Sequence, residues 1–103
     1  MKNIFLILIL SSFYNFIFCQ DVQKNIFLDR DFWKSKPSVE LVKTKIGEGN
    51  DPVEQDDFGF DAVSYGIIDN TPIETIKYLL TLAGNPVTKK THGNITYLLW
   101  SAY

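Results

Sequence analysis

Two residue types that often carry chemistry are scarce in this chain. Its 103 residues include one cysteine, Cys19, and one histidine, His92. A disulfide needs two cysteines, and a metal centre needs several histidine, cysteine or carboxylate side chains close together. The sequence therefore excludes an intrachain disulfide framework. It predicts no metal site, no cofactor and no catalytic residue, and hence no enzyme.

An excess of charge of either sign is also lacking. Ten Lys and Arg side chains stand against twelve Asp and Glu, for a formal net charge of −2. Proteins that bind nucleic acid or anionic membrane surfaces usually carry clustered positive charge. We therefore expect neither nucleic acid nor an anionic membrane surface as a partner.

An apolar run long enough to span a membrane is missing too. Lys2 precedes a continuous apolar run over residues 4–10, and a broken one follows over residues 13–18. A spanning helix needs about 20 predominantly apolar residues, whereas a basic start and a short apolar stretch are typical of a secretory signal peptide. We predict a signal peptide over residues 1–19 and a mature domain over residues 20–103. The mature chain would be periplasmic or secreted, without membrane insertion.

Cys19 leaves a second reading of this segment open. Cleavage after Cys19 would make Gln20 the new N-terminus, whereas lipid attachment at Cys19 would leave an anchored protein. Phe18 stands where the lipoprotein pattern has a small residue. Cleavage is therefore favoured over a lipid anchor.

What the mature chain does contain is an internal repeat with a period of about 34 residues, a length typical of stacked repeat units. The segment PSVELVK at residues 37–43 recurs as TPIETIK at residues 71–77. A Gly-Asn pair at residues 49–50 recurs at residues 84–85, and residues 61–66 align with residues 96–101. The matched apolar pairs are Val39 with Ile73, Val42 with Ile76, and Ile46 with Leu80.

Each copy carries the pattern of a helix with defined ends. Its apolar positions recur at i, i+3 and i+7, which is one face of a helix. Pro37 and Pro72 suit the first helical position, and Ser38 or Thr71 can serve as N-caps. The glycine of each Gly-Asn pair falls just past the helix, where a left-handed residue is favoured. The unit is therefore predicted as two helices followed by a turn-rich connector.

In these features the sequence resembles the ankyrin-repeat family. Residues 59–66 cover the family's opening motif G-x-T-P-L-H-x-A, residues 74–80 its outer helix, and residues 84–88 its exit into a hairpin. The resemblance spans roughly residues 28–103. It implies an all-α solenoid of stacked helix-turn-helix pairs with hairpin-like loops, made of a capping repeat (26–54), a full repeat (55–88) and a partial repeat (89–103).

The sequence departs from the family motif at several positions. Asp61 and Ala62 replace the motif's Thr-Pro, and Ser64 and Leu99 replace its histidine, so the hydrogen bonds that hold the corner between hairpin and helix are expected to be partly lost. Asn94 replaces the glycine of the third unit, where asparagine tolerates the left-handed conformation.

The C-terminal end of the array is expected to be incomplete. The third unit stops within its inner helix, so no outer helix covers Leu98, Leu99 and Trp100. Either the 103 residues are the beginning of a longer protein, or a partner surface covers this apolar end.

The candidate binding residues lie on the expected hairpin tips and inner helices, where the resemblance implies that a protein partner docks. An acidic cluster over residues 51–57 lacks the ligand spacing of a calcium loop and is expected to be a solvated tip. His92, beside Gly93, is expected to be an exposed turn residue. The predicted partner-binding residues are Asp56, Asp57, Phe58, Tyr65, Lys89, Lys90, His92 and Trp100.

The resemblance implies an extracytoplasmic protein–protein interaction scaffold. Two alternatives from other classes stay open. One is the N-terminal docking or regulatory segment of a longer exported enzyme. The other is a small secreted toxin, immunity protein or inhibitor of irregular fold, which has no reason to be mostly helical.

Overall fold

The computed structural model describes residues 24–102. The predicted signal peptide and Cys19 lie outside the described residues. Within that range every regular element is a helix, and the one strand-like feature is an isolated bridge between Lys90 and Thr96. The helices are η1 (Ile26–Leu28), α2 (Arg30–Lys34), α3 (Val39–Gly47), α4 (Ala62–Ile68), α5 (Ile73–Leu80), η2 (His92–Asn94) and α6 (Tyr97–Trp100).

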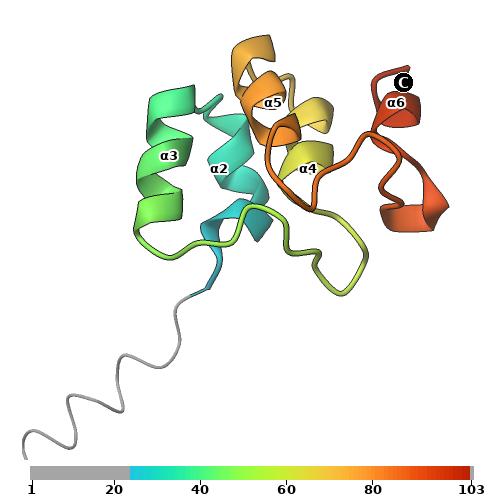
Figure 1. Ribbon diagram of the computed structural model, residues 1–103, viewed down its shortest axis with the longest axis horizontal. Coiled ribbons are helices and arrows are strands. Elements are labelled where there is room, and N and C mark those ends of the chain that lie inside the picture. The colour runs from blue at the N-terminus through green and yellow to red at the C-terminus, as the bar shows by residue number, and fades with distance from the viewer. Residues whose placement is uncertain (1–23, 103) are drawn as a thin grey trace, which may run out of the picture.

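The helices form two layers. Helix α4 contacts α2 on one side and α6 on the other, while α3 and α5 contact each other in the second layer. The pair α2 and α3 is thus followed by the pair α4 and α5, with α6 at the far end (Figure 1). The loop over residues 48–61 runs along the lower side of that view, and the orange to red loop over residues 81–96 runs from α5 toward α6 on the right. The all-α prediction is confirmed.

The two repeated segments form helices that begin one repeat period apart and lie side by side. Val39 opens α3 and Ile73 opens α5. Lys43 of α3 places its Nζ atom 5.3 Å from the centre of the Tyr78 ring of α5. The hydroxyl of Thr75 donates to the carbonyl oxygen of Pro37 at 2.8 Å. The two copies therefore share a conformation and contact each other directly.

The starts of these two helices differ from the prediction in both copies, since neither proline occupies the first helical position, and only one of the two expected caps forms. Ser38 caps α3, accepting a hydrogen bond from the Leu41 backbone N–H at 3.2 Å, as expected. In α5 the N-cap position is occupied by Pro72, which has no side-chain oxygen. The expectation that Thr71 could cap α5 is wrong, because Thr71 lies one residue before the cap. Neither proline is inside its helix.

Backbone conformations repeat with the same period. Lys36 and Asn70, which precede the paired helices, adopt φ values of 55° and 54°. Gly49 and Gly84, past the ends of α3 and α5, adopt φ values of 102° and 94°. Residues with side chains rarely adopt a positive φ, so its recurrence at equivalent positions marks the same turns in both units.

The corner before α4 is held more firmly than its sequence indicated. Asp61 caps α4 by accepting from the Ser64 backbone N–H at 3.0 Å, and the Ser64 hydroxyl accepts from the Asp61 backbone N–H at 2.8 Å. This reciprocal arrangement is a capping box, which satisfies two backbone donors at once. The expected loss of corner hydrogen bonds is therefore compensated by the residues that replace the motif.

The core lies between the two layers and is aromatic at its N-terminal end. Phe27, Phe32 and Trp33 are buried, with Phe32 and Trp33 edge to face at 5.0 Å between ring centres. The Trp33 indole donates to the carbonyl oxygen of Phe27 at 2.9 Å. Val42 of α3 and Leu79 of α5 are fully buried against this cluster.

The α6 end of the molecule is open, as the sequence predicted. Leu98 and Leu99 are 75% and 53% exposed. Trp100 is only partly exposed, because its indole donates to the Thr91 hydroxyl at 2.7 Å and its ring lies near Phe60.

Candidate functional site

The loops over residues 48–61 and 81–96 stack on each other and form a continuous surface. Gln55 donates through Nε2 to the carbonyl oxygen of Lys90 at 2.8 Å, and Nδ1 of His92 lies 2.6 Å from the carbonyl oxygen of Phe58. A Cβ atom at Gly59 would lie 3.0 Å from the backbone nitrogen of His92. We call these stacked loops, together with Tyr65 and Trp100, the loop face.

Each loop is closed by the same backbone hydrogen bond. Asp56 N–H donates to the Phe60 carbonyl at 2.8 Å, and Thr91 N–H donates to the Ile95 carbonyl at 2.9 Å at the equivalent place in the next unit. Gly59 and Asn94 adopt positive φ at the matching position of each loop. The expectation that Asn94 can replace the motif glycine is confirmed by its φ of 60°.

Phe60 is the centre of the loop face. Its ring stacks on Tyr65 at 5.2 Å and on His92 at 4.5 Å, and it lies 5.8 Å from the Trp100 ring. Three predicted binding residues from different elements thus converge on one phenylalanine. Aromatic pairs of this kind contribute roughly 0.5–1.5 kcal/mol beyond the burial of their area.

Sequence reasoning missed Phe60, although a signal for it exists. A hydrophobic residue just before an N-cap often packs on the residue four positions into the helix, an arrangement called a hydrophobic staple. Phe60 precedes the cap Asp61, and Tyr65 is the fourth residue of α4. The capping box together with its flanking aromatics therefore predicts this stack.

Side chains of the loops hold the two large aromatics in place. The Tyr65 hydroxyl donates to the Asp56 carboxylate, and the Trp100 indole donates to the Thr91 hydroxyl. Thr91 is the repeat equivalent of Asp56, and Trp100 is the equivalent of Tyr65, so the same contact occurs in both units. Burial and, to a smaller extent, the hydrogen bond that Tyr65 donates to Asp56 raise the pKa of Tyr65 well above its usual value.

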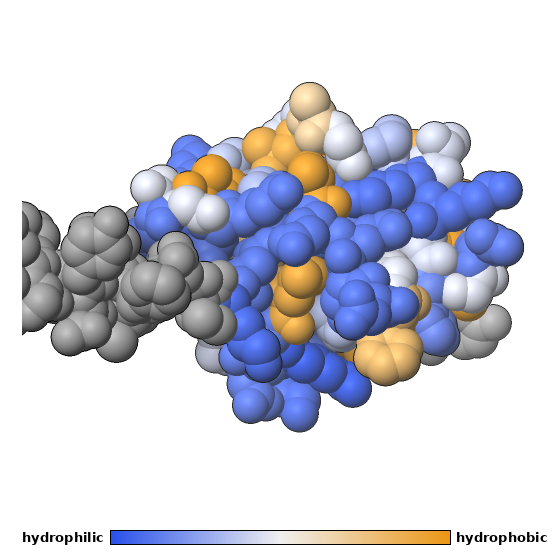
Figure 2. Space-filling view, turned by 90° about the horizontal axis from the view of Figure 1, so that it is seen from below, coloured by the Kyte–Doolittle hydropathy of each residue, from blue (hydrophilic) through white to orange (hydrophobic). Residues whose placement is uncertain are grey.

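The residues of the loop face that reach solvent are of mixed chemistry. Phe58 is 72% exposed, and Asp57, Lys90 and His92 are exposed around it. Seen from the side on which the loops lie, the surface is largely hydrophilic with separate hydrophobic patches (Figure 2). His92 is thus an exposed turn residue, as predicted. An exposed aromatic ring among charges of both signs suits noncovalent recognition of a protein surface.

Lys89 does not join these exposed residues. Its Nζ atom lies 3.0 Å from the carboxylate of Asp61, which is fully buried, and donates to the Val53 carbonyl at 2.8 Å and the Asn85 side chain at 3.1 Å. The Tyr97 hydroxyl donates to the same carboxylate of Asp61. Burial, followed by this hydrogen bond, raises the pKa of Tyr97 well above its usual value. The Lys89 side chain therefore pairs with buried groups and does not contribute to the exposed surface of the loop face.

The acidic loop owes its shape to its own carboxylates. Asp51 accepts from the Val53 backbone N–H at 2.9 Å, and Asp56 accepts from the backbone N–H groups of Phe58 and Phe60 at 2.9 and 3.0 Å. In the described part of the chain, no three His, Cys, Asp or Glu side chains lie close enough together to hold a metal ion. These carboxylates act as turn formers.

Membrane-spanning character and similarity to known proteins are two further features that bear on function. Among residues 24–102, no helix has the length and apolar character needed to cross a membrane. No family model, curated protein or solved structure matches the chain. Any assignment of function therefore depends on the sequence and on the geometry described above.

Proposed function

We propose that this chain is an extracytoplasmic scaffold of the ankyrin-repeat type that binds another protein through its loop face. The observation that carries the proposal is the repetition of whole sets of contacts with the period of the sequence repeat. Paired helices, positive-φ turns, loop-closing hydrogen bonds and the bond between each loop and the aromatic of the following helix all recur. Repeats of this kind present extended surfaces for partners.

The chemistry of the loop face supports a binding role. Tyr65, His92 and Trp100 are held around Phe60 before any partner arrives, so little side-chain entropy would be lost on binding. Phe58 projects from this ordered base as an exposed ring. Rigid aromatic anchors ringed by polar groups are typical of the residues that dominate binding energy. Charged neighbours on the same face would then orient the partner.

Photocrosslinking tests this assignment. A photoreactive phenylalanine analogue at Phe58 is expected to give one discrete protein adduct in cells that export the chain. The same analogue at Lys77, an exposed position of α5 away from the loop face, serves as the matched control. Adducts of equal yield from both positions, or none from Phe58, would contradict a binding role for the loop face.

Export is tested separately. Because residues 1–19 have the pattern of a signal peptide, the intact mass of the exported protein should correspond to a chain that begins at Gln20. A mass that includes a lipid on Cys19 would indicate the anchored alternative. Retention of the uncleaved chain in the cytoplasm would overturn the extracytoplasmic part of the proposal.

A further inference from the structure

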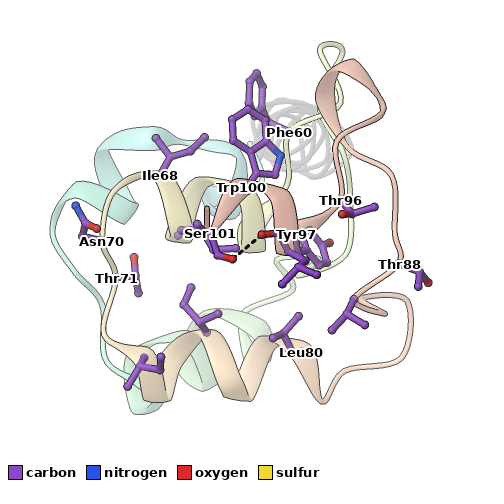
Figure 3. A pocket seen from close by; sticks show the side chains of 16 residues that line it. Phe60, Ile68, Asn70, Thr71, Leu80, Thr88, Thr96, Tyr97, Trp100 and Ser101 are labelled. Atoms are coloured by element: carbon purple, nitrogen blue, oxygen red, sulfur yellow. Dashed lines mark hydrogen bonds between the residues drawn. The ribbon is translucent and has the colours of Figure 1, made fainter. Parts of the chain in front are cut away.

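A second surface of the molecule, which adjoins the loop face at Phe60 and Trp100, is a large apolar groove. It has a volume of about 1110 Å³ and runs between α5 and α6. Side chains of the two helices face the open space from opposite sides, with Leu80 on one and Tyr97 and Ser101 on the other (Figure 3). Ile73 and Leu98, which also line it, are 68% and 75% exposed. Exposed apolar side chains gathered in a hollow make it a candidate binding site.

The corresponding face one repeat earlier is already covered by a helix. The apolar face of α3 includes Val42, which is fully buried where α5 packs on α3. Ile73, Ile76 and Leu80 of α5 are the repeat equivalents of the apolar residues of α3, and all three line the groove. The groove is thus continuous with, and built like, an interface that the molecule itself fills with a helix.

A polar contact in the filled interface also has a counterpart in the groove. In the filled interface, the carbonyl oxygen of Pro37 accepts a hydrogen bond from the hydroxyl of Thr75. Thr71 is the repeat equivalent of Pro37 and lines the groove, so its carbonyl oxygen is the counterpart of that acceptor. The side-chain hydroxyl of Thr71 is a separate group, shielded from solvent and without a hydrogen-bond partner among the described residues.

The size of the groove fits one short helix. A helix with side chains is about 10–12 Å wide and rises about 1.5 Å per residue, so eight residues occupy roughly 900–1400 Å³. Helix α5, which fills the preceding interface, has eight residues. A second copy of the chain would present the same groove, and two hollow surfaces do not fill each other.

We propose that this groove binds an amphipathic helix of a partner protein, laid along α5 as α5 is laid along α3. In α5 the two residues most deeply buried are Thr75 and Leu79, four positions apart on one face. The partner helix accordingly carries a hydroxyl residue that meets the carbonyl oxygen of Thr71 and, four positions later, a large aliphatic residue that enters the groove. This proposal deepens the proposed binding function, on which it rests, by adding a second contact site and the class of its ligand.

A peptide of residues 70–83 of this chain is the probe, because it contains the helix that fills the equivalent interface. Acetylated, amidated and labelled with a fluorophore, it is titrated with the purified chain and followed by fluorescence anisotropy. We expect saturable micromolar binding that is accompanied by helix formation in the peptide. The peptide variant Leu79→Asp should bind at least tenfold more weakly, because a charge would enter the apolar groove.

Two adjacent leucines supply a matched pair of protein variants. Leu98 lines the groove and Leu99 does not, although both are exposed on α6. Leu98→Asp should weaken peptide binding at least tenfold, whereas Leu99→Asp should leave it within twofold of the parent chain. Because both residues are exposed, neither change should unfold the chain, and circular dichroism checks this.

The peptide variant Thr75→Val tests the polar contact without altering the fold of the chain. It removes the hydroxyl expected to meet the Thr71 carbonyl oxygen, so peptide binding should weaken about three- to tenfold. Equal binding by Leu98→Asp and the parent, or equal loss with Leu99→Asp, would overturn the proposal. A doubled mass by sedimentation that Leu98→Asp abolishes would assign the groove to a second copy instead. If Phe58 gives no crosslink while the peptide still binds the groove, the loop-face proposal fails and the groove proposal stands.

Discussion

The two ends of this molecule hold their helices together by different means. At the N-terminal end, Phe27, Phe32 and Trp33 form a buried aromatic cluster between the layers. At the other end, α6 is joined to α4 by Tyr97, whose hydroxyl meets the buried carboxylate of Asp61, itself paired with a lysine. Apolar burial is nondirectional and supplies most of the stability of a fold, whereas a buried ion pair is sensitive to geometry and contributes little net stability.

The comparison teaches that stability and positioning are supplied by separate regions. The aromatic cluster stabilises the first two helix pairs. The polar junction of Asp61, Lys89 and Tyr97 sets where the second loop and α6 lie, and therefore where Trp100 meets Phe60. A substitution in the aromatic cluster should unfold the chain. A substitution in the polar junction should lower stability and also displace the loop face.

The largest effect is expected from Trp33→Ala. This change leaves a cavity beneath Phe27 and Phe32 and should lower the free energy of unfolding by about 3–5 kcal/mol. Because small domains are stable by only about 5–15 kcal/mol, urea unfolding followed by circular dichroism should show a greatly reduced midpoint. Leu41→Ala, at a position 38% exposed, is the control and should change stability by under about 1 kcal/mol. A midpoint for Trp33→Ala near that of the parent would refute the role of the cluster.

Lys89→Met should have the next largest effect. It leaves the Asp61 carboxylate buried without its cation, which costs about 3 kcal/mol. Adding Asp61→Asn removes the uncompensated charge, so the double variant should be more stable than Lys89→Met alone. A double-mutant cycle measured by urea unfolding gives the coupling, expected at about 1–3 kcal/mol. Strict additivity of the two changes would show that the ion pair is not the link at this junction.

The junction should also make stability depend on alkaline pH. The pKa of Tyr97 is raised in the folded chain, while an unfolded tyrosine ionises near pH 10. Its contribution is therefore fully present below about pH 10 and is lost as the pH rises above that value, by up to about 1.4 kcal/mol per pH unit. Urea midpoints at pH 8, 9.5 and 11 should fall less in Tyr97→Phe than in the parent. Identical pH profiles would contradict a raised pKa at this hydroxyl.

The smallest effect is expected from substitutions at two equivalent turns, one in each unit. Lys36 and Asn70 both have positive φ, which a lysine tolerates less well than an asparagine. Lys36→Gly should therefore stabilise the chain by about 0.5 kcal/mol, and Asn70→Gly should be close to neutral. Thermal midpoints measured side by side detect the difference. A gain for Asn70→Gly that exceeds the gain for Lys36→Gly would mean that the two turns are not equivalent.

Much of the local structure could be predicted from residues close in sequence. Ser38 begins a helix because its hydroxyl pairs with a nearby backbone N–H, and Gly49 follows a helix end because it adopts a positive φ without strain. Thr71 does not cap α5 because the helix begins one residue later than the sequence indicated, with Pro72 in the N-cap position. Boundaries of that kind respond to packing, so they are the least predictable part of a helix.

Some members of the candidate site were predicted, but its centre, Phe60, and the inward direction of Lys89 were not. Phe58, Lys90 and His92 are exposed at the loop face, as the turn-rich composition of both loops indicated. Lys89 is adjacent to Lys90, yet it points inward to Asp61, which belongs to the preceding unit. No local pattern distinguishes two neighbouring lysines.

The sequence by itself determined that the chain repeats, that each unit is helical, and that Gly49 and Gly84 follow helix ends with positive φ, because these follow from residue spacing and from backbone preferences within a short stretch of chain. Only the tertiary structure decided which side chains meet between units. Phe60 became the centre of an aromatic stack, Lys89 paired with the buried Asp61, and the apolar residues of α5 came to line an open groove. These outcomes depend on contacts between residues of successive units. Such contacts form, and contribute to stability, only when the units pack on each other.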